Sequence, residues 1–587
     1  GSLGGWIAVL EVESVRLGPE KDLEVNGKVY TIYPEVRDGS PAPEPKYGER
    51  WALEGWLKPA SEMKPGRRIY YRLRRINAKL YQAEDGIRER MGPGDVPALM
   101  RTGTALRSRF EEVLEERVSA PYNQLLGRML LGKRQDMDEG LEDIFRRAGL
   151  AHVLVVSGIH VWFMLTAFML LGVLWNRRPW VSFAVLSVVL LMYYAITGGG
   201  PSITRATVMG FVFLAALLFG ADYRAKTALF IAALFMMVVN PLVIYRVGAQ
   251  LTFLASAGVV FIYPELRAFF PERALWGRML RGMLVAVAAQ LPIFPVIAYH
   301  FNQVCAVSPL SNLFVVPLVG VLLPLDVITC VSGLVPGPLA TVPAFLAETL
   351  ARLIMWLAGV FSSLPGADIP SASPPLWWIA LYECCLAAGV YTLSRLREGS
   401  DIEINRGLAV TAALAVFLLF PSLWSLRPAG LRAVFIDVGE GDSALVEAPL
   451  EPGGGVFRML VDAGGAWGEY EEIYDPGERS VGAYLKKRGI RALDAVMLSH
   501  AEADHMNGLQ WVLENVRVDR FIDTGAKVSV LCGVFADEAV CADPARREHE
   551  PDMSPAQVES HARLLETVKQ RDVEDSRAEA GLVIDLK

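Results

Sequence analysis

The sequence predicts a multi-domain membrane protein with a small all-β barrel, a polytopic α-helical bundle of about ten spans and a soluble α/β domain, in that order. The first observation behind this prediction is that residues 151–426 consist of apolar segments separated by short loops rich in Gly, Pro and Arg. A helix of about 20 apolar residues crosses the roughly 30 Å hydrocarbon core of a bilayer and satisfies its own backbone polar groups. The second is that both flanks have the composition of ordinary soluble domains.

The net charge of the chain limits the classes of function that it can have. The net charge of -7 over 587 residues excludes a chain that binds a polyanion over its whole surface, so any nucleic-acid surface has to be local. The chain begins at Gly1-Ser2 with neither methionine nor a signal peptide. We therefore expect the chain to be truncated upstream.

Residues 1–82 are predicted to form the barrel, because short runs rich in Val, Ile, Tyr and Trp alternate with Gly/Pro/Asp turns. Cationic and aromatic side chains gather near its end: Lys64, Arg67, Arg68, Tyr70, Tyr71, Arg72, Arg74 and Arg75. Such a mixture suits a platform for single-stranded nucleic acid, where charge follows the phosphates and rings stack on bases. A solvated strand face beside anionic lipid headgroups explains it equally well.

Residues 83–150 are predicted to contain amphipathic helices. Leu125, Leu126, Met129 and Leu130 form one apolar stripe, and residues 141–145 contain a second. Neither stripe has spanning length, so we expect these helices to lie at the membrane interface or to pack on the bundle.

Residues 151–426 should contain ten spans. They are predicted at 151–174, 180–197, 203–220, 226–240, 248–263, 279–300, 304–335, 339–364, 376–394 and 407–425. Prolines in the sixth and seventh spans predict broken helices. Lys and Arg concentrate in alternate loops, while loops 198–202, 301–303 and 365–375 hold none. By the positive-inside rule the basic loops are cytoplasmic, and both soluble ends are then extracytoplasmic.

Ionisable residues inside the predicted spans indicate function, because charge in a membrane is costly and usually faces a pathway or a partner. His160, Arg205 and Asp326 are the predicted channel residues. Glu348 and Arg352 are one helical turn apart, and we expect a structural ion pair there.

The C-terminal domain carries the predicted chemistry. A strand at residues 493–499 delivers His500-Ala-Glu502-Ala-Asp504-His505 to the start of a helix, and Asp462 ends an earlier strand. Imidazoles and carboxylates within one turn suit a pair of divalent cations that activate water and hold a phosphoryl group. The absence of thiolates favours Mn²⁺ or Mg²⁺ over Zn²⁺. The alternative is a charged loop in which Asp504 caps the helix.

This motif resembles the metallo-β-lactamase signature His-x-His-x-Asp-His with Glu502 in place of the second His, a replacement that is similar to the ComEC family of DNA uptake channels. Other stretches agree with that family: residues 149–161, 205–209, 240–241, 248–253 and 435–442. The resemblance implies an OB-like barrel at residues 1–82, a transmembrane competence domain at 151–426 and a partial metallo-β-lactamase-like domain at 427–587. It further implies an inner-membrane protein that passes single-stranded DNA and degrades the other strand.

In that family the resemblance implies two metal ions bound by His500, Glu502, Asp504, His505 and Asp462, with Asp504 and His505 catalytic. It also implies a DNA receptor and a cytoplasmic translocation ATPase as partners. No second His cluster follows, and His549 and His561 are predicted to be surface residues, so we expect weak or absent metal binding. The competing predictions are a solute or lipid transporter with an inactive hydrolase-like module, and a membrane-anchored metal-dependent nuclease. Cys532 and Cys541 could pair or remain thiols.

Overall fold

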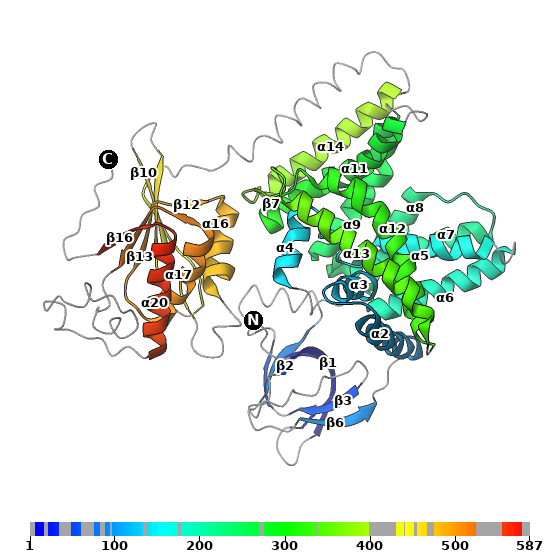
Figure 1. The fold of residues 1–587 in the computed structure, drawn as a ribbon, viewed down its shortest axis with the longest axis horizontal. Coiled ribbons are helices and arrows are strands. Elements are labelled where there is room, and N and C mark those ends of the chain that lie inside the picture. The colour runs from blue at the N-terminus through cyan, green and yellow to red at the C-terminus, as the bar shows by residue number, and fades with distance from the viewer. Residues whose placement is uncertain are drawn as a thin grey trace.

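The computed structural model separates the protein into N-terminal sheets, a helical bundle and a C-terminal α/β domain (Figure 1). The residues it describes are 6–16, 22–33, 49–53, 55–59, 61, 76–82, 88–93, 97–132, 138–173, 178–268, 275–335, 337–397, 430–439, 441–450, 455–465, 475–523 and 555–577.

The N-terminal part is all-β, as predicted. Strands β1 (Trp6–Arg16), β2 (Asp22–Tyr33), β5 (Ala78–Gln82) and β4 (Gly55–Pro59) form one sheet in the order β1-β2-β5-β4. A second, two-stranded sheet pairs β3 (Glu49–Leu53) with β6 (Arg88–Pro93). These described strands do not close on themselves, and the OB-like barrel stays a prediction. The predicted DNA-binding residues, from Lys64 to Arg75, lie outside the described residues.

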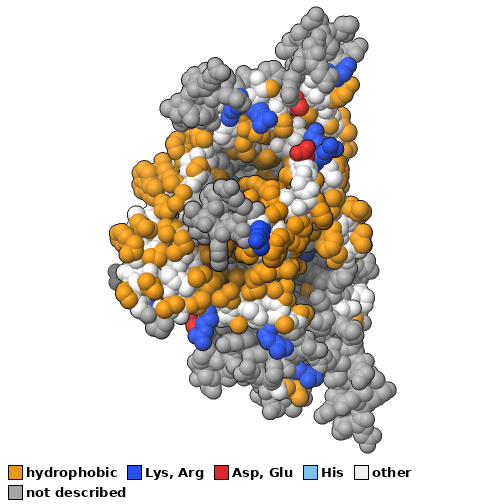
Figure 2. Space-filling view, turned by 90° about the vertical axis from the view of Figure 1, so that its right-hand side faces the viewer, with side chains coloured by type: hydrophobic (Ala, Val, Ile, Leu, Met, Phe, Trp, Pro, Cys, Tyr) orange, Lys and Arg blue, Asp and Glu red, His pale blue; other side chains and the backbone are white. Residues whose placement is uncertain are grey.

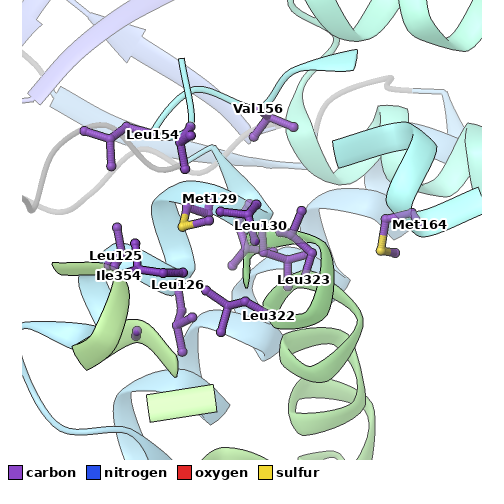
Figure 3. Close-up of a cluster of buried hydrophobic side chains, with 14 of the residues drawn as sticks. Leu125, Leu126, Met129, Leu130, Leu154, Val156, Met164, Leu322, Leu323 and Ile354 are labelled. Atoms are coloured by element: carbon purple, nitrogen blue, oxygen red, sulfur yellow. The ribbon is translucent and has the colours of Figure 1, made fainter. Parts of the chain in front are cut away.

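The amphipathic helices pack on the bundle. They are α2 (Ala98–Arg117), α3 (Tyr122–Leu131) and α4 (Glu139–Arg147). Leu126 and Met129 of α3 are fully buried, in one core with Leu322 of α12 (Ser308–Gly333) and Ile354 of α13 (Thr341–Ser362) (Figure 3). The apolar stripe of α3 therefore faces other helices of this chain.

The described residues of the bundle contain fewer helices of spanning length than the ten predicted. Its remaining elements are α5 (Gly158–Val173), α6 (Pro179–Thr197), α7 (Pro201–Leu218), α8 (Ala225–Val239), η2 (Pro241–Tyr245), α9 (Val247–Ala257), η3 (Gly258–Ile262), α10 (Tyr263–Arg267), α11 (Leu275–Phe301), η4 (Pro338–Ala340) and α14 (Leu376–Arg397). Seven helices in the described residues are long and apolar enough to cross a membrane, and two more apolar helices are shorter. The predicted span 407–425 lies outside the described residues, so ten spans remain a prediction.

Many apolar side chains of these helices face outward. Phe345 is 69% exposed and Val238 is 75% exposed. Hydrophobic side chains cover much of one face of the bundle (Figure 2). A surface of this kind is compatible with lipid and unusual for a protein surrounded by water.

The prediction of broken helices in the sixth and seventh spans was wrong. Both α11 and α12 run through their internal prolines. Pro295 has no N–H for the carbonyl four residues earlier, Leu291, and the buried Tyr382 hydroxyl of α14 donates to that oxygen at 2.9 Å. A neighbouring helix thus supplies the hydrogen bond that the proline removes, and the helix continues.

The loops at one end of the bundle are joined to each other. Strand β7 (Gln303–Val304) pairs with β8 (Ile369–Pro370), and Arg147 lies 3.7 Å from Asp368. Loops 301–303 and 365–375, which lack basic residues, therefore lie on the same side of the bundle, as their charge predicts.

The C-terminal domain is an α/β fold around a six-stranded sheet in the order β16-β15-β13-β11-β10-β9. The strands are β9 (Arg432–Phe435), β10 (Ala444–Pro449), β11 (Val456–Val461), β13 (Ala495–Leu498), β15 (Arg520–Asp523) and β16 (Glu574–Arg577). A two-stranded sheet, β12 (Ala492–Leu493) with β14 (Arg517–Val518), and the helical elements η8 (Gly477–Gly482), α16 (Ala483–Arg488), α17 (Ala503–Asn515) and α20 (Pro555–Gln570) complete it. Strands β11, β13, β15 and β16 are parallel, so their carboxyl ends share one edge.

This domain contacts the bundle through the opposite edge of the sheet. The N–H of Ser373 donates to the carbonyl of Lys487 at 3.0 Å, and Arg491 donates to the carbonyl of Pro370 at 2.7 Å. Lys487 and Arg491 precede β12 and β13, so they lie where the parallel strands begin. The carboxyl edge is the one that does not dock.

Candidate functional site

The carboxyl edge of the parallel strands gathers the predicted metal ligands. Asp462 follows β11, His500 follows β13, and Asp523 ends β15. Glu502 precedes α17, whose first turn carries Asp504 and His505. Because parallel strands deliver their ends to one edge, residues far apart in the chain meet here.

Asp462 is the buried centre of this edge. It is 2% exposed and has a φ of +55°, a left-handed conformation that Asp tolerates better than most residues. Its Oδ1 accepts from the N–H of Ser499 at 2.8 Å, and its Oδ2 accepts from the Ser499 hydroxyl. The same Oδ2 lies 2.9 Å from Nδ1 of His505, which must be the donor because an ionised carboxylate only accepts. Asp462 therefore fixes the His505 ring and leaves its Nε2 available, as the partner of a metal-binding His does.

The remaining motif residues form two neighbouring pairs. Nε2 of His500 lies 3.7 Å from Oε2 of Glu502, and Nε2 of His505 lies 3.8 Å from Oδ2 of Asp504. The His500 and His505 ring centroids are 4.0 Å apart. Oδ1 of Asp504 is buried without a hydrogen-bond partner in the described part of the chain, which is unusual for a carboxylate oxygen.

Two glycines let the surrounding loops approach the start of α17. A Cβ on Gly441 (φ +81°) would lie 1.6 Å from the carbonyl oxygen of Asp504, and one on Gly465 would lie 1.6 Å from that of Ala503. The N–H of Ala463 donates to the carbonyl of His505 at 3.0 Å. Asp437 and Asp442, in the first of these loops, are exposed.

The imidazoles and carboxylates of the motif are chemically suited to a divalent metal, but they do not converge on one point. Two imidazoles and two carboxylates are the ligands that Mn²⁺ accepts, and Asp504 Oδ1 and His505 Nε2 have no hydrogen-bond donor or acceptor to occupy them in the described residues. Yet no group of three or more His, Cys, Asp or Glu residues converges as metal ligands would, within the residues described. The metal-ligand role of the motif therefore stays a prediction.

His561 was wrongly predicted to be a surface residue. It is 1% exposed, and its Nε2 lies 3.2 Å from Oδ2 of Asp523 at the same sheet edge. Its helix α20 packs on the domain core through Leu564, Leu565 and Val568. Positions 561, 564, 565 and 568 have the spacing of one helix face, and this pattern could have revealed the burial. His549, Cys532 and Cys541 lie outside the described residues.

The predicted channel residues are all buried in the bundle. His160 is 1% exposed, Arg205 7% and Asp326 0%. They lie on α5, α7 and α12, and the structure shows no hydrogen bond or ion pair among them within its described part. His160 accepts the N–H of Ser157 at 2.9 Å and so caps α5, which begins at Gly158 rather than at residue 151, the predicted start of the first span. Asp326 has one oxygen without a partner among the described residues.

The ion pair predicted for Glu348 and Arg352 is confirmed, with Nη2 2.5 Å from Oε1. Glu348 also accepts from the N–H of Ser119 at 3.1 Å and from its hydroxyl at 2.8 Å. These bonds connect α13 to the turn between α2 and α3. The pair is therefore structural.

Comparisons with known proteins agree on two regions. Residues 129–396 match the family described as competence protein, and residues 436–529 match the metallo-beta-lactamase superfamily. ComE operon protein 3 of Bacillus subtilis is 25% identical over 409 residues, which are 67% of this chain and 50% of that protein. Competence protein ComA of Neisseria gonorrhoeae is 27% identical over 404 residues, 66% of this chain and 52% of its own length.

A third relative, the uncharacterized protein YcaI of Escherichia coli, is 24% identical over 432 residues, covering 71% of this chain and 53% of that protein. The chain thus spans about half the length of these curated relatives. No solved structure matches it.

Proposed function

The chain belongs to the ComEC family of competence proteins, and from that premise we propose that it takes part in DNA uptake, passing a single strand across the inner membrane through its helical bundle. One relative is named competence protein ComA, the family matched by residues 129–396 is described as competence protein, and the seven apolar helices of the described residues fit a membrane protein. The proposed boundaries are a barrel at 1–82, helices at 83–150, a transmembrane domain at 151–426 and a metallo-β-lactamase-like domain at 427–587.

The observation that carries the proposal is the contact between the C-terminal domain and loop 363–375. Hydrogen bonds from Ser373 to Lys487 and from Arg491 to Pro370 hold a hydrolase-like domain against one end of the bundle. Loops 301–303 and 365–375 at that end contain no Lys or Arg, which supports an extracytoplasmic location. A polyanion handled by this domain would then be on the side from which it enters.

The finer assignments are also proposals. The metallo-beta-lactamase match implies use of a divalent metal. We assign the ligand role to His500, Glu502, Asp504 and His505, with Mn²⁺ or Mg²⁺ preferred, and Asp462 positions His505. Degradation of the second strand, the DNA receptor and the translocation ATPase follow from the family resemblance.

The test is transformation by the full-length protein carrying His505→Ala, scored separately for degradation of the outer strand and arrival of the inner strand. We expect degradation to fall and arrival to persist. Asp519→Asn, an exposed carboxylate at the docking edge, is the control and should change neither. Normal DNA arrival after His160 and Arg205 are replaced by Leu would favour a membrane-anchored nuclease over a channel. If DNA uptake persists in cells that lack the whole protein, the solute or lipid transporter hypothesis is favoured.

A further inference from the structure

Arg205 is a buried cation without an anionic partner. It lies on α7, and no carboxylate forms an ion pair with it in the part of the chain that the structure describes. Its hydrogen-bond acceptors are neutral: Nε donates to the Thr252 hydroxyl at 2.9 Å, and Nη1 donates to the Ser256 hydroxyl. A guanidinium cannot lose its charge readily, so an uncompensated one inside a helical bundle costs free energy.

Its surroundings add positive potential. The amino-terminal end of α5 begins at Gly158, and a Cβ there would lie 2.5 Å from Nη2 of Arg205. Gly158 therefore makes the room in which the guanidinium meets a helix end that carries about half a positive charge. A basic side chain at this end is the arrangement least suited to a merely structural contact. It is suited to an anion.

One part of the guanidinium is left for a ligand. Nε and Nη1 are held by α9 through Thr252 and Ser256, and the Ser256 hydroxyl donates its own hydrogen to the carbonyl of Thr252 at 2.8 Å. Both hydroxyls therefore act as acceptors that orient the planar group. Nη2, which points to the start of α5, makes no hydrogen bond within the described residues.

We propose that Arg205, with the amino-terminal end of α5, is a seat for one backbone phosphate of the strand in the bundle. This inference rests on the proposed function, because it takes the transported strand as the anion. A phosphodiester supplies the missing negative charge and accepts from Nη2 and from the helix end together. Thr252 and Ser256 position the guanidinium. The seat would hold each phosphate without reading the base sequence.

The test measures binding of a short fluorescent oligothymidylate to the full chain in uncharged detergent, over a range of salt. Arg205→Gln should weaken binding roughly 10-fold to 100-fold, the range for a lost hydrogen bond to a charged group. It should also make the slope of log affinity against log salt shallower by about 0.7, the value for one single-strand phosphate. Arg128→Gln is the matched control, because Arg128 is equally buried and also has guanidinium nitrogens without a hydrogen bond in the described residues, but its charge is compensated by Glu142 at 2.9 Å. It should alter neither quantity.

Gly158→Ala provides an independent variant, since its Cβ displaces the guanidinium without removing the charge. It should weaken binding like Arg205→Gln. Unchanged affinity and slope in a folded Arg205→Gln or Gly158→Ala chain would overturn the proposal. So would equal binding of an oligomer with a neutral methylphosphonate backbone.

Two further arms separate the sources of phosphate. If inorganic phosphate or phosphatidylglycerol, but not the oligothymidylate, raises the Tm of the wild-type chain and not of Arg205→Gln, the ligand is a free ion or a lipid headgroup, and the strand proposal is overturned. DNA uptake that persists without the protein would refute the proposed function alone, while Arg205-dependent oligonucleotide binding would still support the seat.

Discussion

Asp462→Asn should loosen the start of α17 more than any other single-atom change in the C-terminal domain. The carboxylate accepts three hydrogen bonds, from the N–H and hydroxyl of Ser499 and from His505. Bonds to a charged acceptor contribute about 1 kcal/mol more each than neutral ones, and an amide also places a donor against a donor. Together, the three weakened hydrogen bonds and the donor–donor contact should cost about 3 to 5 kcal/mol of local stability. Asn accepts a positive φ as Asp does, so the variant changes the charge and not the backbone.

Hydrogen exchange read by mass spectrometry over residues 499–515 measures this effect directly, because local opening sets the exchange rate. We expect exchange to accelerate between about a hundredfold and a few thousandfold. Asp494→Asn is the control: Asp494 accepts a single N–H, from Arg458 at 2.7 Å, and should cost about 1 kcal/mol. Equal acceleration in both variants, or none in Asp462→Asn, would refute the reasoning.

Four other outcomes follow from the same contacts. Gly258→Ala should cost about 3 kcal/mol in thermal unfolding, because its Cβ would lie 2.0 Å from a carbonyl oxygen of α11, whereas Gly248→Ala, with open space around it, should be nearly neutral; equal effects would contradict this. Tyr382→Phe should lower bundle stability by about 1 to 2 kcal/mol because the carbonyl freed by a proline loses its donor; unchanged thermal unfolding would count against that. Cysteines at Ser373 and Lys487, in a chain stripped of its native cysteines, should form a disulfide on mild oxidation, and failure to cross-link would reject the docking contact. Calorimetric titration with Mn²⁺ should give a dissociation constant of about 1 mM or weaker, because three ligands do not converge in the described residues, and micromolar binding would disprove this.

The proximity of the candidate site residues was predictable because they are close in sequence or end neighbouring strands. The motif from His500 to His505 follows a strand and opens a helix, so its proximity is local. Asp462 was included because it ends an earlier strand, and the parallel pairing of β11 with β13 brings it to the same edge. His561 was missed although its spacing with Leu564, Leu565 and Val568 marks one helix face, because only the packed domain shows that a core covers this face.

The bundle shows the same division between local and distant information. Hydrophobicity predicted the apolar helices, because spanning length is a property of each segment alone. The consequence of Pro295 could not be predicted in this way, since the compensating hydroxyl comes from Tyr382, 87 positions further along. Likewise, the sequence singles out Arg205, and only the packing of α5 against α7 shows that its guanidinium lies against Gly158.

The C-terminal domain docks through the edge where its parallel strands begin. This arrangement separates the proposed site of strand degradation from the end of the bundle. Strand β11 has six residues and is therefore roughly 20 Å long, and the His505 cluster and the loop that meets the bundle lie at opposite ends of the parallel strands. Under the proposed function, duplex arriving at the membrane must already have come apart before either strand reaches its destination. Degradation of one strand and passage of the other would then take place at separate sites, and loss of the nuclease site need not block the channel.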